Sequence, residues 1–189
     1  MASTVEQRDP YTAGHQRRAT KLACAIGIEL GLSKEKLEGL HVAGILHDIG
    51  KIYVPAEILN KPGRLSDLEM KLVKGHSGTG YMLVKEIPFP WPVAQIIIQH
   101  HERINGSGYP LGISGEEILL EARILAVADV IEAMASHRPY RPAKGIDEAL
   151  DEITKNRGVL YDPKVVDACM KLFADKRFKL KMDPNMYSI

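Results

Sequence analysis

The sequence has few cysteines, no long apolar run and no excess of one charge, and each shortage excludes a class of protein. Its two cysteines, Cys24 and Cys169, are too few for a disulfide framework and favour a reducing compartment, the cytoplasm. No apolar run approaches the ~20 residues that a membrane-spanning helix needs. Residues 1–8 lack the apolar centre of a signal peptide. Lys and Arg number 25 against 24 Asp and Glu, so a duplex DNA partner is not expected.

The chain instead has the length and composition of one folded domain. It contains 189 residues, of which 45% are hydrophobic and 26% charged, and this balance is typical of globular chains. We expect a single domain over residues 1–189, with a core over residues 8–173. The basic segment 176–189 has little periodicity and is predicted to be a solvated C-terminal tail.

Apolar residues recur at three- and four-residue intervals through most of the chain, which is typical of amphipathic helices. No convincing period-two strand pattern is present, so the predicted fold class is all-α. Two capping boxes, Ser66–Glu69 and Ser114–Glu117, are expected to begin two of the helices. The predicted helices cover residues 12–30, 33–47, 66–83, 93–100, 118–135, 146–154 and 163–173.

Several polar residues occupy positions on the apolar faces of these helices. His15, His76 and His100 each lie three or four residues from an apolar position of the same face, and so does Asp129. A single buried histidine is usually a core residue with an ordinary hydrogen bond. A buried carboxylate without a partner is costly, so Asp129 requires either an arginine or a metal ion.

Two doublets, His47-Asp48 and His100-His101, add further ligand types at predicted helix ends. The combined set offers nitrogen and oxygen ligands and no cysteine, which suits two divalent ions, Fe or Mn first, with Zn, Ni and Mg as alternatives. A carboxylate can bridge two such ions ~3.5–4 Å apart, with a hydroxide nucleophile between them. The sequence therefore predicts a two-metal site formed by His15, His47, Asp48, His76, His100, His101 and Asp129.

At this point the motifs resemble a known family. Residues 46–52, LHDIGKI, resemble the His-Asp motif of the HD phosphohydrolase superfamily, and residues 100–110, HHERINGSGYP, resemble the motif of its HD-GYP subgroup. Segments 8–15, 126–130, 138–141 and 161–163 match the subgroup in the same order. The resemblance covers residues 8–173 and implies an HD-domain-like helical bundle with its metal site between the helices.

The resemblance also implies an activity, the hydrolysis of cyclic di-GMP to linear pGpG and in some members on to GMP. By the same resemblance, Asp48 bridges the two ions. Lys51 matches the family's lysine near the scissile phosphate, where it would assist the departing ribose oxygen; the alternative is a surface lysine beyond a helix end. The implied ligands are His15, His47, Asp48 and Asp129 for one ion, and Asp48, His76, His100 and His101 for the other.

Three further residues are candidates for substrate binding. Arg138 and Arg141 flank a Pro-Tyr turn, and their planar guanidinium groups suit phosphate, although ordinary surface ion pairing is the alternative. Tyr109, in the Gly-Tyr-Pro turn, could stack on guanine or position a phosphate. In the family this turn is also a docking surface for diguanylate-cyclase domains, and the resemblance allows a homodimer.

Two positions depart from the family pattern. Tyr11 stands where some members have a glutamate that enables a third metal ion, so two ions are predicted here. Glu132 stands where an aspartate is usual, three residues after Asp129, and is expected to change a contact around the ligands or the substrate.

The open alternatives are an HD phosphohydrolase with another nucleotide substrate, a di-iron oxygenase, and a non-hydrolytic cyclic di-GMP receptor or adaptor. The complete ligand set and Lys51 favour hydrolysis.

Overall fold

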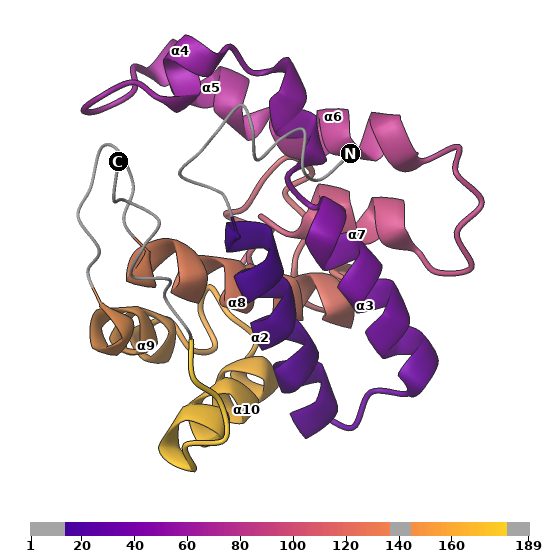
Figure 1. Cartoon of the computed structure of the whole chain (residues 1–189), viewed down its shortest axis with the longest axis vertical. Coiled ribbons are helices and arrows are strands. Elements are labelled where there is room, and N and C mark those ends of the chain that lie inside the picture. The colour runs from indigo at the N-terminus through magenta and orange to yellow at the C-terminus, as the bar shows by residue number, and fades with distance from the viewer. Residues whose placement is uncertain (1–13, 137–144, 181–189) are drawn as a thin grey trace.

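A computed structural model describes residues 14–136 and 145–180, which form a bundle of helices (Figure 1). Within these residues there is no β-strand and only one isolated bridge, between Arg157 and Tyr161. The all-α prediction is confirmed. The elements, with η marking 3₁₀ turns, are α2 (His15–Glu29), α3 (Lys34–Leu46), η2 (Ile49–Tyr53), α4 (Ala56–Leu59), α5 (Asp67–Lys74), α6 (His76–Val84), α7 (Val93–Gln99), η3 (Gly115–Glu117), α8 (Leu120–Ala135), α9 (Ile146–Lys155) and α10 (Pro163–Ala174).

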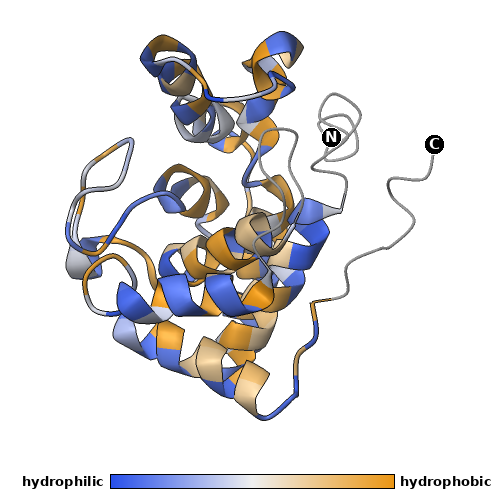
Figure 2. Ribbon diagram, turned by 90° about the vertical axis from the view of Figure 1, so that its left-hand side faces the viewer, coloured by the Kyte–Doolittle hydropathy of each residue, from blue (hydrophilic) through white to orange (hydrophobic). Residues whose placement is uncertain are grey.

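Helix α8 forms the centre of the hydrophobic core. It packs against α2, α3, α7, α9 and α10, and Figure 2 shows the apolar surfaces of the surrounding helices turned inward. A helix that is apolar on most sides is stable only when neighbours cover it on most sides. This surrounded helix is the rigid support from which Asp129 and Glu132 project. Its fully buried apolar residues are Ala122, Ile124, Leu125, Val127, Ala128 and Ile131.

Helices α4, α5 and α6 form a lobe at the top of Figure 1. The lobe is joined to the bundle through α6, which packs on η2 and on α7. The approach of η2 to α6 is close, because a Cβ atom at Gly50 would overlap the carbonyl oxygen of His76. Only glycine allows this contact, which brings the segment after Asp48 directly against the start of α6.

Two predicted helix boundaries are wrong. The predicted helix over residues 66–83 is two helices, α5 and α6, which meet at Gly75. The amide of Gly75 is shared between the carbonyls of Lys71 and Leu72, a pattern common at helix ends. The capping box at Ser114 begins the short turn η3, and α8 begins only at Leu120, because Ile118 has an extended backbone. The turn η2 and helix α4 were not predicted.

The beginning of the predicted tail is attached to the bundle. Arg177 forms an ion pair with Glu29 of α2 at 2.6 Å, and the ring of Phe178 contacts that of Phe173. Arg177 remains exposed to solvent in this pair, so the expectation of a solvated tail over residues 176–189 stays a prediction. Residues 181–189 lie outside the described part of the chain.

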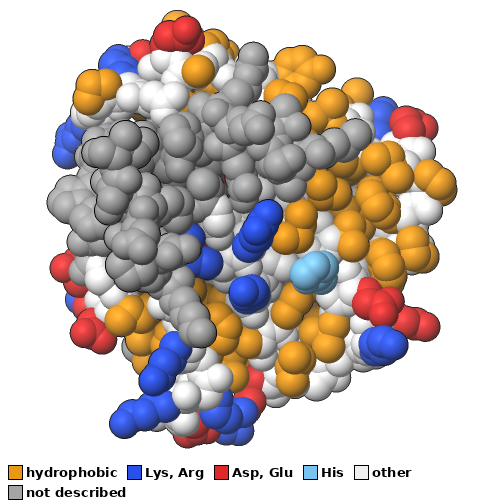
Figure 3. Space-filling model, in the orientation of Figure 1, with side chains coloured by type: hydrophobic (Ala, Val, Ile, Leu, Met, Phe, Trp, Pro, Cys, Tyr) orange, Lys and Arg blue, Asp and Glu red, His pale blue; other side chains and the backbone are white. Residues whose placement is uncertain are grey.

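Some large apolar side chains remain at the surface. Met82, Leu83 and Ile87 are exposed on α6 and just beyond it. Figure 3 shows apolar side chains gathered on the right of the visible face, where Figure 1 places α6 and the segment leading to α7. In the described residues, no helix is both long enough and apolar enough to cross a membrane.

Candidate metal centre

The predicted metal ligands converge, although they come from five different helices or helix ends. Their ligand atoms form three groups, and within each group the atoms lie within 4.8 Å of one another. One group joins the other two, because it shares His47 with one and His100 with the other. The described structure therefore brings all of the predicted ligands into one centre. The groups are His15, His47 and Asp129; His76, His100 and His101; and His47, Asp48 and His100.

The first half-site consists of His15, His47 and Asp129. Asp129 Oδ1 lies 3.0 Å from Nε2 of His15 and 3.8 Å from Nε2 of His47. The Oδ2 atom of Asp48 lies 3.6 Å from the same nitrogen of His47 and 3.9 Å from that of His15. Two imidazole nitrogens and two carboxylate oxygens thus lie close enough together to share one cation.

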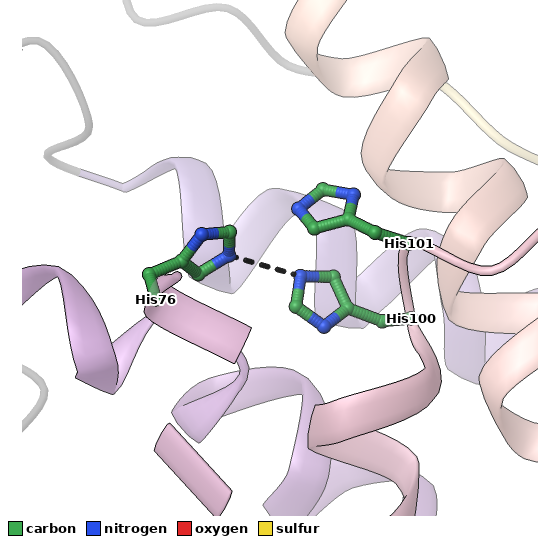
Figure 4. A group of neighbouring side chains, drawn as sticks. All are labelled: His76, His100 and His101. Carbon is green, nitrogen blue, oxygen red and sulfur yellow. Dashed lines mark hydrogen bonds between the residues drawn. The ribbon is translucent and has the colours of Figure 1, made fainter. Parts of the chain in front are cut away.

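The second half-site consists of His76, His100 and His101, which Figure 4 shows at the start of α6 and just after α7. The Nε2 atoms of His76 and His100 lie 3.4 Å apart. Asp48 Oδ1 lies 3.3 Å from Nε2 of His76. The two oxygens of Asp48 therefore approach different half-sites, which is the geometry expected of a carboxylate that bridges two ions.

Backbone carbonyls orient three of the rings. His47, His76 and His100 each place Nδ1 against the carbonyl oxygen three residues earlier, at 2.7, 2.7 and 2.6 Å. These bonds keep the proton on Nδ1 and leave a lone pair on Nε2. The lone pair of His47 is buried with no hydrogen-bond donor, and those of His76 and His100 face each other. Buried lone pairs without donors are rare in proteins, and bound cations would satisfy them.

His15 is oriented by a side chain instead. Its Nδ1 contacts the carboxylate of Glu132, which is fully buried. That carboxylate also accepts hydrogen bonds from Arg18 at 2.7 Å and from Ser136 at 2.5 Å. The departure from the family pattern at Glu132 thus contacts a predicted metal ligand, His15. Arg18 was missed by the sequence reasoning, although it lies one helical turn after His15.

The two half-sites hold their protons differently. Burial lowers the pKa of His15, but Glu132 and Asp129 outweigh it and raise the pKa to about 9. Burial lowers the pKa of His100 to about 3, with a further contribution from neighbouring histidines, and it also lowers the pKa of His76 and His101. Uncharged imidazole is the metal-binding form, so the second half-site is ready for a cation at neutral pH.

The shared carboxylate is ionised despite its burial. Burial would raise the pKa of Asp48, but Lys51 and the surrounding histidines hold it well below its usual range. The Nζ atom of Lys51 lies 2.7 Å from Asp48 Oδ2, and its side chain is only 11% exposed. Lys51 is therefore directed into the centre and is not a solvated surface lysine.

A cavity of about 750 Å³ opens beside the centre, within the size range of small-molecule sites, about 300–1,000 Å³. Asp48, Lys51, His76, His101 and Asp129 line it together with Tyr109. The ring of Tyr109 stacks on His101 with 4.7 Å between centroids. The predicted substrate-binding tyrosine thus lies against His101, a predicted ligand of the second half-site.

The turn that carries Tyr109 is held by a residue that sequence reasoning did not select. Glu102 is buried and accepts hydrogen bonds from the backbone amides of Leu111 and Gly112, at 2.7 and 3.3 Å. A Cβ atom at Gly108 would overlap the backbone of Glu102, so the turn packs directly on the segment after His101. The position of Glu102 beside the histidine doublet was the signal that could have identified it.

Three predicted positions cannot be placed. Arg138, Arg141 and Tyr11 lie outside the described residues. The substrate-binding role of the two arginines and the prediction of two ions from Tyr11 stay predictions.

The chain is similar in sequence to several known proteins. A family model described as HD domain matches residues 1–165. The cyclic di-GMP phosphodiesterase response regulator RpfG of Xanthomonas campestris is 43% identical over 173 residues, which are 90% of this chain and 46% of that protein. The 3'3'-cGAMP-specific phosphodiesterase 3 of Vibrio cholerae is 39% identical over 168 residues, which are 88% of this chain and 36% of that protein.

A solved structure also has this fold. An HDG"Y"P protein from Bdellovibrio bacteriovorus superimposes with a TM-score of 0.70 at 22% identity, over 85% of this chain and 51% of that one. The chain spans less than half the length of the two curated relatives.

Proposed function

Because this chain belongs to the HD domain family, whose phosphohydrolases are metal-dependent, we propose that it hydrolyses cyclic di-GMP, mainly to linear pGpG. The observation that carries the proposal is the position of Asp48, with one oxygen toward each half-site. The name of the relative from Xanthomonas campestris supports cyclic di-GMP as the substrate. The proposed reaction breaks one of the two phosphodiester bonds of the ring.

The half-sites define the proposed ligands. His15, His47 and Asp129 would hold one ion, and His76, His100 and His101 the other, with Asp48 shared. The nitrogen and oxygen donors and the absence of cysteine among them favour Fe or Mn, with Zn, Ni and Mg as alternatives. When bound, two such ions would activate a water molecule and offset the charge on the phosphoryl oxygens.

Lys51 and Asp48 have the proposed catalytic roles in this chain. The ammonium group of Lys51 lies in the cavity beside Asp48 and can donate a proton there. We assign to it the protonation of the departing ribose oxygen. The carboxylate of Asp48, 2.7 Å from the Nζ atom, would orient Lys51 until the substrate binds.

The substrate would contact Tyr109, whose ring lines the cavity. We also propose that Arg138 and Arg141 contact phosphate, and this proposal rests on their sequence motif alone. Docking of a diguanylate-cyclase domain at the Gly-Tyr-Pro turn and a homodimer are also proposals. A reducing location, the cytoplasm, is favoured by the two free cysteines.

A second cyclic dinucleotide is a specific alternative substrate. The relative from Vibrio cholerae is named for 3'3'-cGAMP, which contains the same type of phosphodiester bond. The two substrates differ in one base, so discrimination between them would depend on contacts to that base. Both substrates are therefore needed in the assay.

The test is a substrate panel with product identification. The protein, purified without oxygen and loaded with Fe or Mn, is incubated with cyclic di-GMP, 3'3'-cGAMP and a mononucleotide, and the products are separated by chromatography. We expect pGpG to accumulate from cyclic di-GMP. Tight binding without turnover would favour the receptor alternative, and GMP released without detectable pGpG would contradict the proposed product.

A further inference from the structure

One side of the cavity beside the metal centre is lined by residues that lie outside the sequence motifs. The turn between α4 and α5 contributes Gly63, Arg64 and Leu65 to the lining, and α5 contributes Met70 and Val73. These residues come from the lobe at the top of Figure 1 and complete a space whose other side is formed by the metal-ligand candidates.

Arg64 is a cation that lines this cavity without an ion-pair partner among the described residues. Among the described lining residues, the positive side chains are those of Lys51 and Arg64. Lys51 is already paired with Asp48 at 2.7 Å. Arg64 has an exposed side chain and makes no hydrogen bond or ion pair with the described part of the chain. As far as the described residues go, an unpaired guanidinium group therefore lines a space that, under the proposed function, holds an anionic ligand.

The turn is held in place without help from Arg64. Lys61, before the turn, donates hydrogen bonds at 2.8 Å to both carboxylate oxygens of Glu69 on α5. Glu69 also accepts hydrogen bonds from the backbone and hydroxyl of Ser66, which closes the capping box. Gly63 has a φ of 92°, a conformation that favours glycine. These contacts hold the backbone of the turn, and none of them uses the guanidinium group of Arg64.

We propose that Arg64 binds the phosphate of the cyclic dinucleotide that is not being cleaved. This inference rests on the proposed function. A cyclic dinucleotide carries two phosphodiester groups, each with one negative charge, and only one of them can occupy the metal centre. The planar guanidinium group offers two parallel hydrogen bonds to phosphate oxygens. The apolar side chains of Leu65, Met70 and Val73 provide surface for the faces of the purine bases.

The test compares two substrates that differ in their number of phosphates. Cyclic di-GMP has a second phosphate, and bis(p-nitrophenyl) phosphate has only the one that is cleaved. Arg64→Gln should raise KM for cyclic di-GMP by about tenfold, the value of one charge-assisted contact. Because the second phosphate keeps its charge throughout the reaction, kcat should change by less than about threefold. Kinetics with bis(p-nitrophenyl) phosphate should not change, and Arg64→Lys should give an intermediate KM.

Lys71→Gln is the matched control. Lys71 is an exposed cation of the same lobe, on α5, but it lines a neighbouring hollow and not this cavity. Its removal changes the net charge by the same amount as Arg64→Gln. We expect unchanged KM and kcat with both substrates, which would separate a direct contact at Arg64 from general attraction of anions.

The outcomes distinguish this inference from the proposed function. Equal rises in KM for cyclic di-GMP and 3'3'-cGAMP support a phosphate contact, whereas a rise confined to cyclic di-GMP assigns Arg64 to a guanine and overturns the inference. Wild-type hydrolysis of cyclic di-GMP with an unchanged KM in Arg64→Gln overturns the inference alone. A wild-type protein that cleaves bis(p-nitrophenyl) phosphate but no cyclic dinucleotide overturns both.

Discussion

The two half-sites of the metal centre use similar rings but different surroundings. In the first, His15 is held by the carboxylate of Glu132 and faces Asp129. In the second, His76 and His100 are held by backbone carbonyls, and the nearest carboxylate is the shared Asp48. The first half-site therefore carries its own negative charge, and the second depends on Asp48 for it.

This difference has a consequence for protons. A carboxylate partner stabilises a protonated imidazole, whereas a neutral carbonyl in a buried site does not compensate for its desolvation. Accordingly, the pKa of His15 is raised to about 9, while the pKa of His100 is lowered to about 3. A cation must displace a proton from the first half-site at neutral pH and need not do so in the second.

The largest effect is expected for Asp48, because it serves both half-sites. Asp48→Ala should abolish detectable hydrolysis and remove most of the bound metal. His76→Ala, the comparison variant, should empty only the second half-site and leave about one ion per chain where about two are expected. Elemental analysis after anaerobic purification, with an assay on cyclic di-GMP, measures both. Full metal occupancy in Asp48→Ala would show that Asp48 is not a bridge.

Lys51 should affect the chemical step without affecting either half-site. If it protonates the leaving oxygen, its interaction develops mainly in the transition state. Lys51→Ala should then lower kcat by about 10²-fold with little change in KM, the usual effect of losing a general acid. Arg138→Ala, by contrast, should raise KM more than it lowers kcat. Steady-state kinetics with metal content measured for each variant provide the check, and a normal kcat in Lys51→Ala would refute the assignment.

Glu132 should affect the first half-site alone. Glu132→Gln removes the carboxylate that orients His15, and the loss of such a partner typically weakens metal binding by about 10–100-fold. The second half-site should keep its affinity, which metal titration followed by spectroscopy can resolve. Glu121→Gln is the matched control, since Glu121 is a buried glutamate of the same helix that pairs with Lys36 at 3.4 Å. Equal weakening of both half-sites would contradict the comparison.

The smallest expected effect is on the pH dependence of stability in the metal-free protein. The raised pKa of His15 stabilises the folded state below the ordinary value of 6.5, and this contribution is lost as pH rises toward about 9. The lowered pKa of His100 has the opposite effect. Below pH 6.5 the ring of His100 binds a proton in the unfolded chain but not in the folded one, so this residue lowers the stability of the folded state as pH falls. Stability in a chelator should therefore be highest near about pH 6.5 and fall by about 1 kcal/mol per pH unit above it.

Urea unfolding at several pH values measures this profile. His15→Gln should remove the decline above pH 6.5, since the titrating ring is gone. His41→Gln, which changes an exposed histidine on α3, should leave the profile as it is. A flat profile in the unmodified metal-free protein would count against the difference between the half-sites.

Much of the fold could be predicted from local patterns. The three- and four-residue apolar spacing predicted α2, α3, α8, α9 and α10 to within a few residues. The identification of the HD domain from residues 46–52 is confirmed. The error at residues 66–83 arose because Gly75 keeps a helical backbone angle while the hydrogen-bond pattern changes around it. The apolar spacing is the same on both sides of Gly75, so periodicity alone does not show where one helix ends and the next begins.

The sequence by itself determined which side chains face inward and which of them are able to bind a metal, because helical periodicity and motif spacing are local properties. The tertiary structure alone decided which distant side chains share that interior. Glu132 meets His15 across 117 positions, and Arg64 faces the same cavity as Asp129 from another lobe. Motif spacing predicts neither of these contacts, because both depend on how whole helices pack against one another.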